Sequence, residues 1–436
     1  MGGAARNPRV PAGGGETEVT TAQAPGGRPA EDRPLRVAVD AVATAPGGGL
    51  SYLRHQLPEL EHQGISLLVF ARSAVAADLR DALSSPASAV REVDGRSRIA
   101  RLRFVHARLA VEARRWGAEV LYCPGSTAPL RSRGIPTVVC VQNSLLFGAD
   151  SPRSLQLATQ RPVAWLSALR ASELVHISAS TAAEFSRHSA LRRSYSVVLS
   201  GLGQLEHAPQ TARGNRRDAI VVVSNLYAYK RIDEVLAAFA AEHALRDSYE
   251  LVIAGAEMDV GLRRHLEELA SALGCADRAR FTGFLAGAEL LDLYRRAALM
   301  VSVSRKEAFP LPPAEALAMA VPVVLSDIPA HRELYGRWAR LVTPGDVAGL
   351  RLAMAVAVRR GCVPNHQVEE LRATFSWARN GKALALILRR AADTDPVSVT
   401  RRLQAVQPTA LPRAARAVIG RTTRARPERP ASRLIM

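Results

Sequence analysis

Two glutamates on either side of a proline-rich turn are the first candidates for chemistry. Glu307 and Glu315 stand eight residues apart in the stretch 304–317, where Pro312 and Pro313 favour the start of a helix. Free backbone N–H groups at a helix start attract a phosphate or another anion. Carboxylates beside such a site can accept hydrogen bonds from sugar hydroxyls. The alternative is that Glu315 only favours the helix dipole and that Glu307 is solvated.

Lysine is rare in this chain, so each lysine stands out. There are 55 arginines but only three lysines, Lys230, Lys306 and Lys382, a ratio typical of a coding bias towards arginine. Lys230 follows the apolar run 219–223 and the segment Ser224-Asn-Leu-Tyr-Ala-Tyr. The retention of this lysine in a chain so poor in lysine favours a functional role. The alternative is a solvated lysine at the start of a helix.

Alternating strand-like and helix-like segments predict the scaffold that positions these residues. The expected strands are 35–40, 65–70, 119–122, 137–141, 173–177 and 195–199 in a first half, and 219–223, 250–254, 279–282, 299–303 and 321–325 in a second. Expected helices of the second half are 231–242, 261–273, 288–297 and 313–320, and 366–392 also has a helical pattern. This order predicts an α/β fold of two doubly wound parallel sheets, which bind ligands at the carboxyl ends of their strands.

A glycine-rich turn follows the first expected strand. Gly47, Gly48 and Gly49 come directly before a helical pattern, so the backbone there can approach a diphosphate or an acceptor. On its own this pattern is weak, because most Gly-Gly turns are only turns.

The residues around the paired glutamates resemble the motif of family-4 retaining glycosyltransferases. Matching segments of the C-terminal half are Phe281-Thr-Gly-Phe284, Leu290–Ala297, Val321–Val324, Ser326–Pro329 with Glu333, and Phe375-Ser-Trp377. The N-terminal half fits more loosely, through Asp40, Gly47–Gly49, Tyr52 and Ser178–Thr181. The resemblance covers about residues 35–392, and both tails lie outside it.

The resemblance implies a GT-B fold, in which two Rossmann-like domains bind a nucleotide-sugar across a cleft. It assigns Glu315 to the ribose hydroxyls, Glu307 to the transferred sugar and Lys230 to the diphosphate. Glu307 and Lys230 are therefore the expected catalytic residues. The other expected donor-binding residues are Asn225, Gly48, Gly49, Phe309, Pro310, Leu311 and Gln142.

Three positions depart from the family pattern. Asn225 stands where many relatives have arginine, and Pro310 replaces a common glycine and has no N–H to donate. Gln142-Asn143 replaces a frequent His-Asp pair, so Gln142 can still form hydrogen bonds but does not titrate. Some relatives share the Gln-Asn and Phe-Pro-Leu-Pro variants, so these changes do not mark an inactive enzyme.

The expected domain organisation follows the same pattern. The segments are a disordered leader at 1–33, an N-terminal Rossmann-like acceptor domain at 34–204, a linker at 205–217, a C-terminal Rossmann-like nucleotide-sugar domain at 218–374, a helix at 375–392 that packs back towards the N-terminal domain, and a basic disordered tail at 393–436.

No apolar run approaches the roughly 20 residues of a membrane span, and the leader lacks the apolar core of a signal peptide. The four cysteines are too far apart in sequence to indicate disulfides or a metal site. We therefore expect a cytoplasmic protein.

Positive charge is concentrated in two segments of this chain of net charge +18. The tail 401–436 has nine arginines and one acid, and the run 96–115 is also rich in arginine. On a helix, Arg98, Arg101, Arg108 and Arg115 would share one side, with Leu102, Val105 and Leu109 near the other. Either this is a solvated face over a packed core, or it docks peripherally on an anionic membrane. Nucleic acid is the less favoured partner.

Together these features predict a retaining enzyme that moves a hexose from a nucleoside-diphosphate sugar to a glycan or lipid-linked acceptor, in cell-envelope polysaccharide or glycolipid assembly. No cofactor or metal is expected, because the one Asp-x-Asp, at 393–395, lies past the last helix and not after a strand. One alternative is a nucleotide-sugar epimerase or phosphorylase on the same fold. Another is a non-catalytic scaffold that binds nucleic acid or membrane through the basic tail.

Overall fold

The computed structural model describes residues 33–94, 97–142, 155–189, 194–203, 217–285 and 287–394. The leader up to residue 32, residues 204–216 of the linker region and the tail from residue 395 lie outside the described residues. The expectations for those three segments stay predictions.

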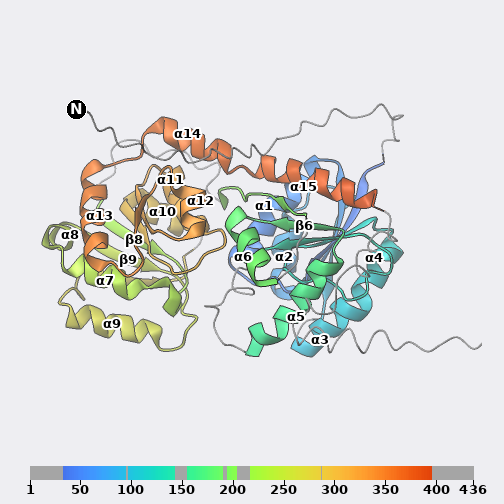
Figure 1. Ribbon diagram of the computed structural model, residues 1–436, viewed down its shortest axis with the longest axis horizontal. Coiled ribbons are helices and arrows are strands. Elements are labelled where there is room, and N and C mark those ends of the chain that lie inside the picture. Colours follow the sequence, from blue (N-terminus) through green and yellow to red (C-terminus); the bar gives the residue numbers. More distant parts are fainter. Residues whose placement is uncertain are drawn as a thin grey trace, which may run out of the picture. The chain divides into compact units, whose positions relative to one another are not determined.

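Two parallel sheets form the scaffold, one in each half of the chain (Figure 1). The N-terminal sheet has seven strands in the order β3-β2-β1-β4-β5-β6-β7, and the C-terminal sheet has six in the order β10-β9-β8-β11-β12-β13. The order reverses between β1 and β4 in one sheet and between β8 and β11 in the other. This is the doubly wound topology that the sequence predicts, so the predicted fold class is confirmed.

The strands of the N-terminal sheet are β1 (Leu35–Ala41), β2 (Ile65–Arg72), β3 (Ala89–Val93), β4 (Val120–Cys123), β5 (Thr137–Val141), β6 (Glu173–His176) and β7 (Ser196–Val197). Those of the C-terminal sheet are β8 (Ala219–Val223), β9 (Glu250–Ala254), β10 (Ala279–Gly283), β11 (Ala297–Ser302), β12 (Val323–Ser326) and β13 (Arg340–Val342). The sequence analysis missed β3 and β13. Both are short edge strands, and β3 is largely exposed, so neither has the continuous apolar run of a buried parallel strand.

The helices of the N-terminal half are α1 (Gly48–His62), α2 (Ser73–Asp81), α3 (Arg98–Arg103), α4 (Ala110–Trp116), α5 (Leu155–Arg170) and α6 (Ala179–Ser189). Those that follow are α7 (Ile232–Ala240), α8 (His243–Ser248), α9 (Leu262–Ala272), α10 (Ala288–Arg296), α11 (Leu311–Ala318), α12 (Pro329–Tyr335), α13 (Val347–Arg360), α14 (Asn365–Thr374) and α15 (Trp377–Ala392).

Helices cover both faces of the C-terminal sheet, which is why its central strand β8 is apolar throughout (Figure 1). Along β8, Ile220 and Val222 pack in the same apolar cluster as residues of α7, α9 and α13. Val221 points to the other face, into the cluster that contains residues of α10, α11 and α14. Because both faces are filled, only the ends of the strands are available for a ligand.

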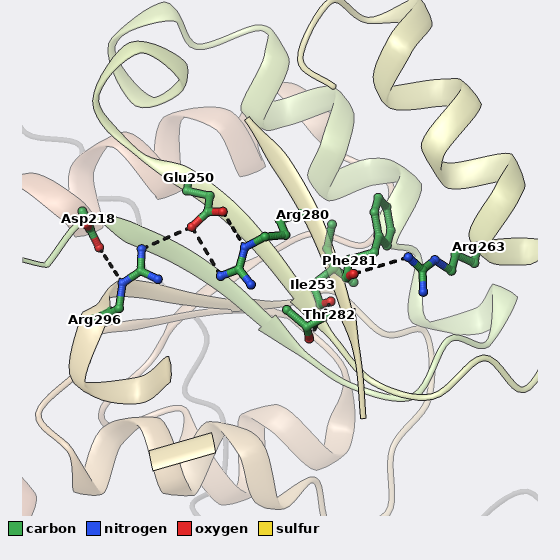
Figure 2. Close-up of polar contacts among 8 residues, drawn as sticks. All are labelled: Asp218, Glu250, Ile253, Arg263, Arg280, Phe281, Thr282 and Arg296. Carbon is green, nitrogen blue, oxygen red and sulfur yellow. Dashed lines mark hydrogen bonds and ion pairs between the residues drawn. The ribbon is translucent and has the colours of Figure 1, made fainter. Parts of the chain in front are cut away.

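Ion pairs join the amino ends of the C-terminal strands, at the edge opposite the carboxyl ends. Figure 2 shows Glu250, the first residue of β9, accepting hydrogen bonds from Arg280 of β10 at 2.6 Å and from Arg296 at the end of α10 at 3.2 Å. Arg296 also donates to Asp218, just before β8, at 3.0 Å. Each such partly exposed pair stabilises the fold by at most about 1 kcal/mol. We therefore interpret this network as structural.

Helix α15 packs against α1, at the N-terminal sheet (Figure 1). The side-chain amide of Gln56 on α1 donates to Asn380 on α15 at 2.9 Å, and Asn380 donates to the carbonyl of Leu199 at 2.8 Å. Trp377, at the start of α15, meets the Tyr52 ring edge-on at 5.3 Å between centroids. Helix α15, the last helix among the described residues, is thus part of the N-terminal core.

The arginine-rich segment is not one regular helix. A π-helix, Phe104–Leu109, separates α3 from α4 and shifts the phase of the side chains along the segment. As a result Leu102, expected on the core side, is 48% exposed, and Ile99 is 69% exposed. The prediction of a core-facing Leu102 is wrong, whereas Leu109 is buried as expected.

Candidate active site

The candidate site lies where the strand order of the C-terminal sheet reverses. The segment Asn225–Lys230 follows β8, and a loop of residues 303–310 follows β11 and leads into α11. Because β8 and β11 are neighbours in the sheet, their carboxyl ends meet at the same place. Open α/β sheets bind their ligands at such a reversal.

A cavity of about 730 Å³ opens at this point. From the C-terminal half it is lined by most of the residues expected from the sequence: Asn225, Lys230, Glu307, Phe309, Pro310, Leu311 and Glu315. From the N-terminal half it is lined by Gly47, Gly48 and a face of α1 with Ser51, Arg54 and His55. The volume is typical of a pocket for a small molecule. Gly49 and Gln142 are not among the lining residues, so the structure does not bring these two to the cavity.

Lys230 and Glu307 form a shielded ion pair within the cavity wall. The Lys230 Nζ lies 2.5 Å from Oε1 of Glu307, and the side chains are 15% and 10% exposed. Burial acts to raise the pKa of Glu307, but the Lys230 charge, assisted by His331, outweighs it and holds that pKa below its usual range. Glu307 is therefore a carboxylate at neutral pH, with a cation beside it.

Glu315 has a different environment, although it lines the same cavity. It lies in α11, is 6% exposed and accepts a hydrogen bond from the Tyr294 hydroxyl at 3.0 Å. Burial raises the pKa of Glu315 to about 7, only partly opposed by that hydrogen bond. The two glutamates thus differ in charge near neutral pH, because only Glu307 has a cation as its partner.

The backbone before Lys230 is shaped by a tight turn. Residues Ala228–Lys230 form a single 3₁₀ turn, and Arg231 after it takes the left-handed conformation, with φ 54°. The Tyr229 carbonyl accepts the N–H of Arg305 at 2.9 Å, which ties this turn to the loop after β11. The Tyr229 ring also lies 5.3 Å from the Lys230 Nζ. The backbone hydrogen bond between Arg305 and Tyr229 joins the segments after β8 and β11, so it helps to fix the distance between Lys230 and Glu307.

Several lining or supporting residues escaped the sequence analysis. Tyr227 and Tyr229 stack at 5.3 Å between ring centroids and line the cavity, and Tyr294 supports Glu315 from α10. The only signal for the first two was their place beside Lys230 in Tyr-Ala-Tyr-Lys. Tyr294 had none, because the aromatic residue of an amphipathic helix is expected in the core.

The remaining expected residues have structural partners. The Asn225 side-chain oxygen accepts the N–H of Ala256 at 3.2 Å, which joins the loops after β8 and β9. The Pro310 carbonyl accepts a hydrogen bond from the Tyr335 hydroxyl at 2.5 Å, and the Phe309 ring meets Phe375 edge-on. At the end of β5, the Gln142 N–H donates to the Ser126 hydroxyl at 3.1 Å. The roles assigned to Asn225, Phe309, Pro310 and Gln142 stay predictions.

No group of three or more His, Cys, Asp or Glu side chains in the described part of the chain is arranged to hold a metal ion. Metal-independent chemistry stays a prediction, since it concerns the reaction and not the fold.

Comparison with known proteins relates the C-terminal half of the chain to a glycosyltransferase family. Residues 204–366 match the family model described as "Glycosyl transferases group 1". The D-inositol 3-phosphate glycosyltransferase of Geodermatophilus obscurus is 29% identical over 276 residues, 59% of this chain and 60% of that protein. The mannosylfructose-phosphate synthase of Agrobacterium fabrum is 28% identical over 172 residues, 36% of this chain and 37% of that protein. These matches span less than two thirds of either relative.

Solved structures share the fold over most of the chain. HepE of Anabaena in complex with UDP-glucose has a TM-score of 0.59 and 18% identity, over 85% of this chain and 100% of that one. Sucrose-phosphate synthase of Thermosynechococcus elongatus has a TM-score of 0.59 and 17% identity, over 86% of this chain and 100% of that one. Together with the two doubly wound sheets, these findings show a GT-B fold, in which residues 204–366 match the group 1 glycosyltransferases (family 4).

Proposed function

We propose that this protein is a retaining glycosyltransferase that transfers a hexose from a nucleoside-diphosphate sugar to a glycan or lipid-linked acceptor. One observation carries the proposal: the pair of Lys230 and Glu307 and the buried Glu315 line a single cavity at the reversal of the C-terminal sheet. A cation for the diphosphate and two carboxylates for sugar hydroxyls are then within reach of one donor molecule.

Lys230 has the main electrostatic role in this proposal. As the bond from the anomeric carbon to the diphosphate oxygen breaks, negative charge grows on the phosphate, and the Lys230 ammonium stabilises it. Glu307 holds that ammonium in place and faces the transferred sugar. No protein nucleophile is required, because the departing diphosphate takes the proton of the acceptor hydroxyl on the same face of the sugar. The protein contributes positioning and charge.

Glu315 is proposed to bind the ribose. Its carboxyl group accepts hydrogen bonds from the ribose hydroxyls in the ionised form and keeps its bond from Tyr294. Asn225, Gly48, Phe309, Pro310 and Leu311, which line the same cavity, are proposed to complete the donor site. No cofactor or metal ion takes part in this scheme.

UDP-glucose is the first donor to test, since HepE, which shares the fold, is seen in complex with it. The acceptor is proposed to meet the donor from the N-terminal half, where Gly47, Gly48 and α1 line the other wall of the cavity. Cell-envelope polysaccharide or glycolipid assembly is the proposed setting.

The proposed place of action is the cytoplasm, at the inner face of an anionic membrane. Ile99 and Leu102 are exposed on α3 among Arg98, Arg101 and Arg103, so apolar side chains and cations could enter the same lipid surface. Within the described residues, none of the helices combines the length and apolar character that crossing a membrane requires.

A ligand panel tests the proposed function. UDP, GDP, ADP and dTDP, each free and as a sugar conjugate, are compared by thermal shift, because a ligand of the native state raises its melting temperature. We expect one base to shift the melting temperature clearly more than the others, and the corresponding sugar conjugate to be consumed when an acceptor is added. Turnover of the donor without any acceptor would favour the epimerase instead. Salt-sensitive DNA binding without any nucleotide shift would favour the scaffold.

A further inference from the structure

Helix α6 of the N-terminal half contacts the loop that carries Glu307. We refer to residues 304–309 as the catalytic loop. Lys306 and Ala308, the two neighbours of Glu307, are both held by α6 or by the residue before it. The Lys306 Nζ lies 2.7 Å from a carboxylate oxygen of Glu184, and the Ala308 carbonyl accepts the Ser178 hydroxyl at 3.0 Å.

A third contact fixes the start of α6 to the C-terminal half. The Glu333 carboxylate of α12 accepts the backbone N–H groups of Ala179 and Ser180, each at 2.6 Å. The next N–H, that of Thr181, is capped by the Ser178 hydroxyl at 3.2 Å. The N–H groups of a first helical turn lack partners within the helix, and a carboxylate there is favoured by the helix dipole. The start of α6 is therefore held firmly against α12.

The contacts of Lys306 and Ala308 are more shielded than an ordinary surface pair. The Lys306 and Glu184 side chains are 14% and 23% exposed, whereas Arg264 and Glu268 on α9 are 85% and 63% exposed. Ser178 is fully buried. Its hydroxyl has one proton, which goes to Ala308, while its oxygen accepts from the α6 backbone. The positions of Lys306 and Ala308, on either side of Glu307, are thus held by Glu184 and Ser178 of the N-terminal half.

The catalytic loop has no helix or strand of its own, so such contacts decide its position. Within the C-terminal half, the N–H of Arg305 is bonded to the Tyr229 carbonyl. Glu307 must stay within hydrogen-bonding distance of Lys230, and a shift of about 1 Å in a reacting group can lower a rate roughly 100-fold.

We infer that Ser178 and Glu184 are positioning residues for Glu307. They hold the catalytic loop through Ala308 and Lys306, so that Glu307 is correctly placed only while α6 lies against the C-terminal half. This inference rests on the proposed function for its kinetic consequence, but not for its structural one.

The test compares the parent with the double variant S178A/E184Q. The matched control is S271A/E268Q on α9, which removes one serine hydrogen bond and one ion pair far from the cavity. We expect kcat to fall about 10- to 100-fold in S178A/E184Q, while the Kd of UDP, or of the diphosphate found in the panel, stays within about twofold. The charge exchange E184K/K306E should recover part of the kcat lost in E184Q alone. The control should match the parent.

Hydrogen exchange of the catalytic loop gives a second readout that needs no activity. Backbone amides of residues 304–309 should exchange faster in S178A/E184Q than in the parent and the control. Unchanged exchange, or faster exchange with unchanged kcat, would overturn the positioning role. A parent that transfers no sugar to any acceptor would count against the proposed function instead, and the exchange experiment would still decide whether α6 holds the loop.

Discussion

Lys230 Nζ and Glu307 Oε1 lie 2.5 Å apart, although the two residues are 77 positions apart in sequence. The turn after β8 and the loop after β11 place them together at the reversal of the sheet. Each is the principal charge partner of the other in a shielded wall of the cavity. Neutralising either one therefore changes the electrostatics of both, and their variants should fail in related but distinguishable ways.

Lys230→Ala should impair turnover more than binding. The substitution removes a cation from the place where charge grows as the glycosidic bond breaks, so kcat should fall roughly 100-fold or more. The Kd of the nucleoside diphosphate should rise much less. Initial rates and a nucleotide titration measure both quantities. Lys382→Ala, which removes an exposed lysine of α15, is the matched control and should leave both unchanged. A Lys230→Ala enzyme with the kcat of the parent would remove Lys230 from the mechanism.

Glu315→Ala should have the opposite profile. It removes hydrogen bonds to the ribose, which does not react, so the loss should appear as weaker donor binding of about 1.5–3 kcal/mol. At saturating donor, kcat should stay close to that of the parent. Calorimetric titration with the nucleoside diphosphate measures the change, and melting curves check the fold. An unchanged Kd would show that Glu315 does not contact the nucleotide.

The stability of the protein should also depend on pH through Glu315. Its pKa is about 7 in the folded protein but close to 4.5 when the chain is unfolded. The stability that protonated Glu315 adds to the folded state is therefore fully present below about pH 4.5 and is lost as the pH rises through 7. The free energy of unfolding should fall by on the order of 3 kcal/mol over this range. Urea denaturation at several pH values, compared with Glu315→Gln, isolates the effect from other titrating groups. Equal pH dependence in the two proteins would contradict it.

The sequence could predict the central site because its residues follow strands. Glu307 and Lys230 each come after a continuous apolar run, and parallel strands end at a common edge, so proximity followed from topology. Contacts between residues far apart in sequence were harder to predict. The support of Glu315 by Tyr294, and of the catalytic loop by Ser178 and Glu184, depends on contacts that no local pattern encodes.

Two other features show why local patterns failed. An uninterrupted α-helix would place Leu102 on the side opposite the arginines, where a core would lie, but the π-helix Phe104–Leu109 changes the phase. The edge strand β3 was missed because its side chains are mostly exposed and include charges. Apolar periodicity reports burial, so it cannot detect an element that is hardly buried.

Ile99 and Leu102, the exposed apolar side chains of α3, should mediate binding to anionic vesicles. I99S/L102S removes the apolar side chains and keeps every arginine, so co-sedimentation with phosphatidylglycerol vesicles should fall several-fold. Turnover on a water-soluble acceptor should not change, because the two residues lie outside the cavity lining. L352S, an exposed leucine of α13, is the matched control. If I99S/L102S bound the vesicles as well as the parent does, α3 would be a solvated face and not a membrane-docking surface.

The most direct test of the account is Glu307→Gln, which keeps the shape of the side chain and removes its charge. The measurement is kcat for sugar transfer beside the Kd of the free nucleoside diphosphate, with melting curves to confirm folding. The account predicts that kcat falls at least about 100-fold, because Lys230 loses the carboxylate that holds it and the transferred sugar loses its anionic partner, while the diphosphate still binds. A Glu307→Gln enzyme that folds and transfers sugar at the rate of the parent would contradict the site as described.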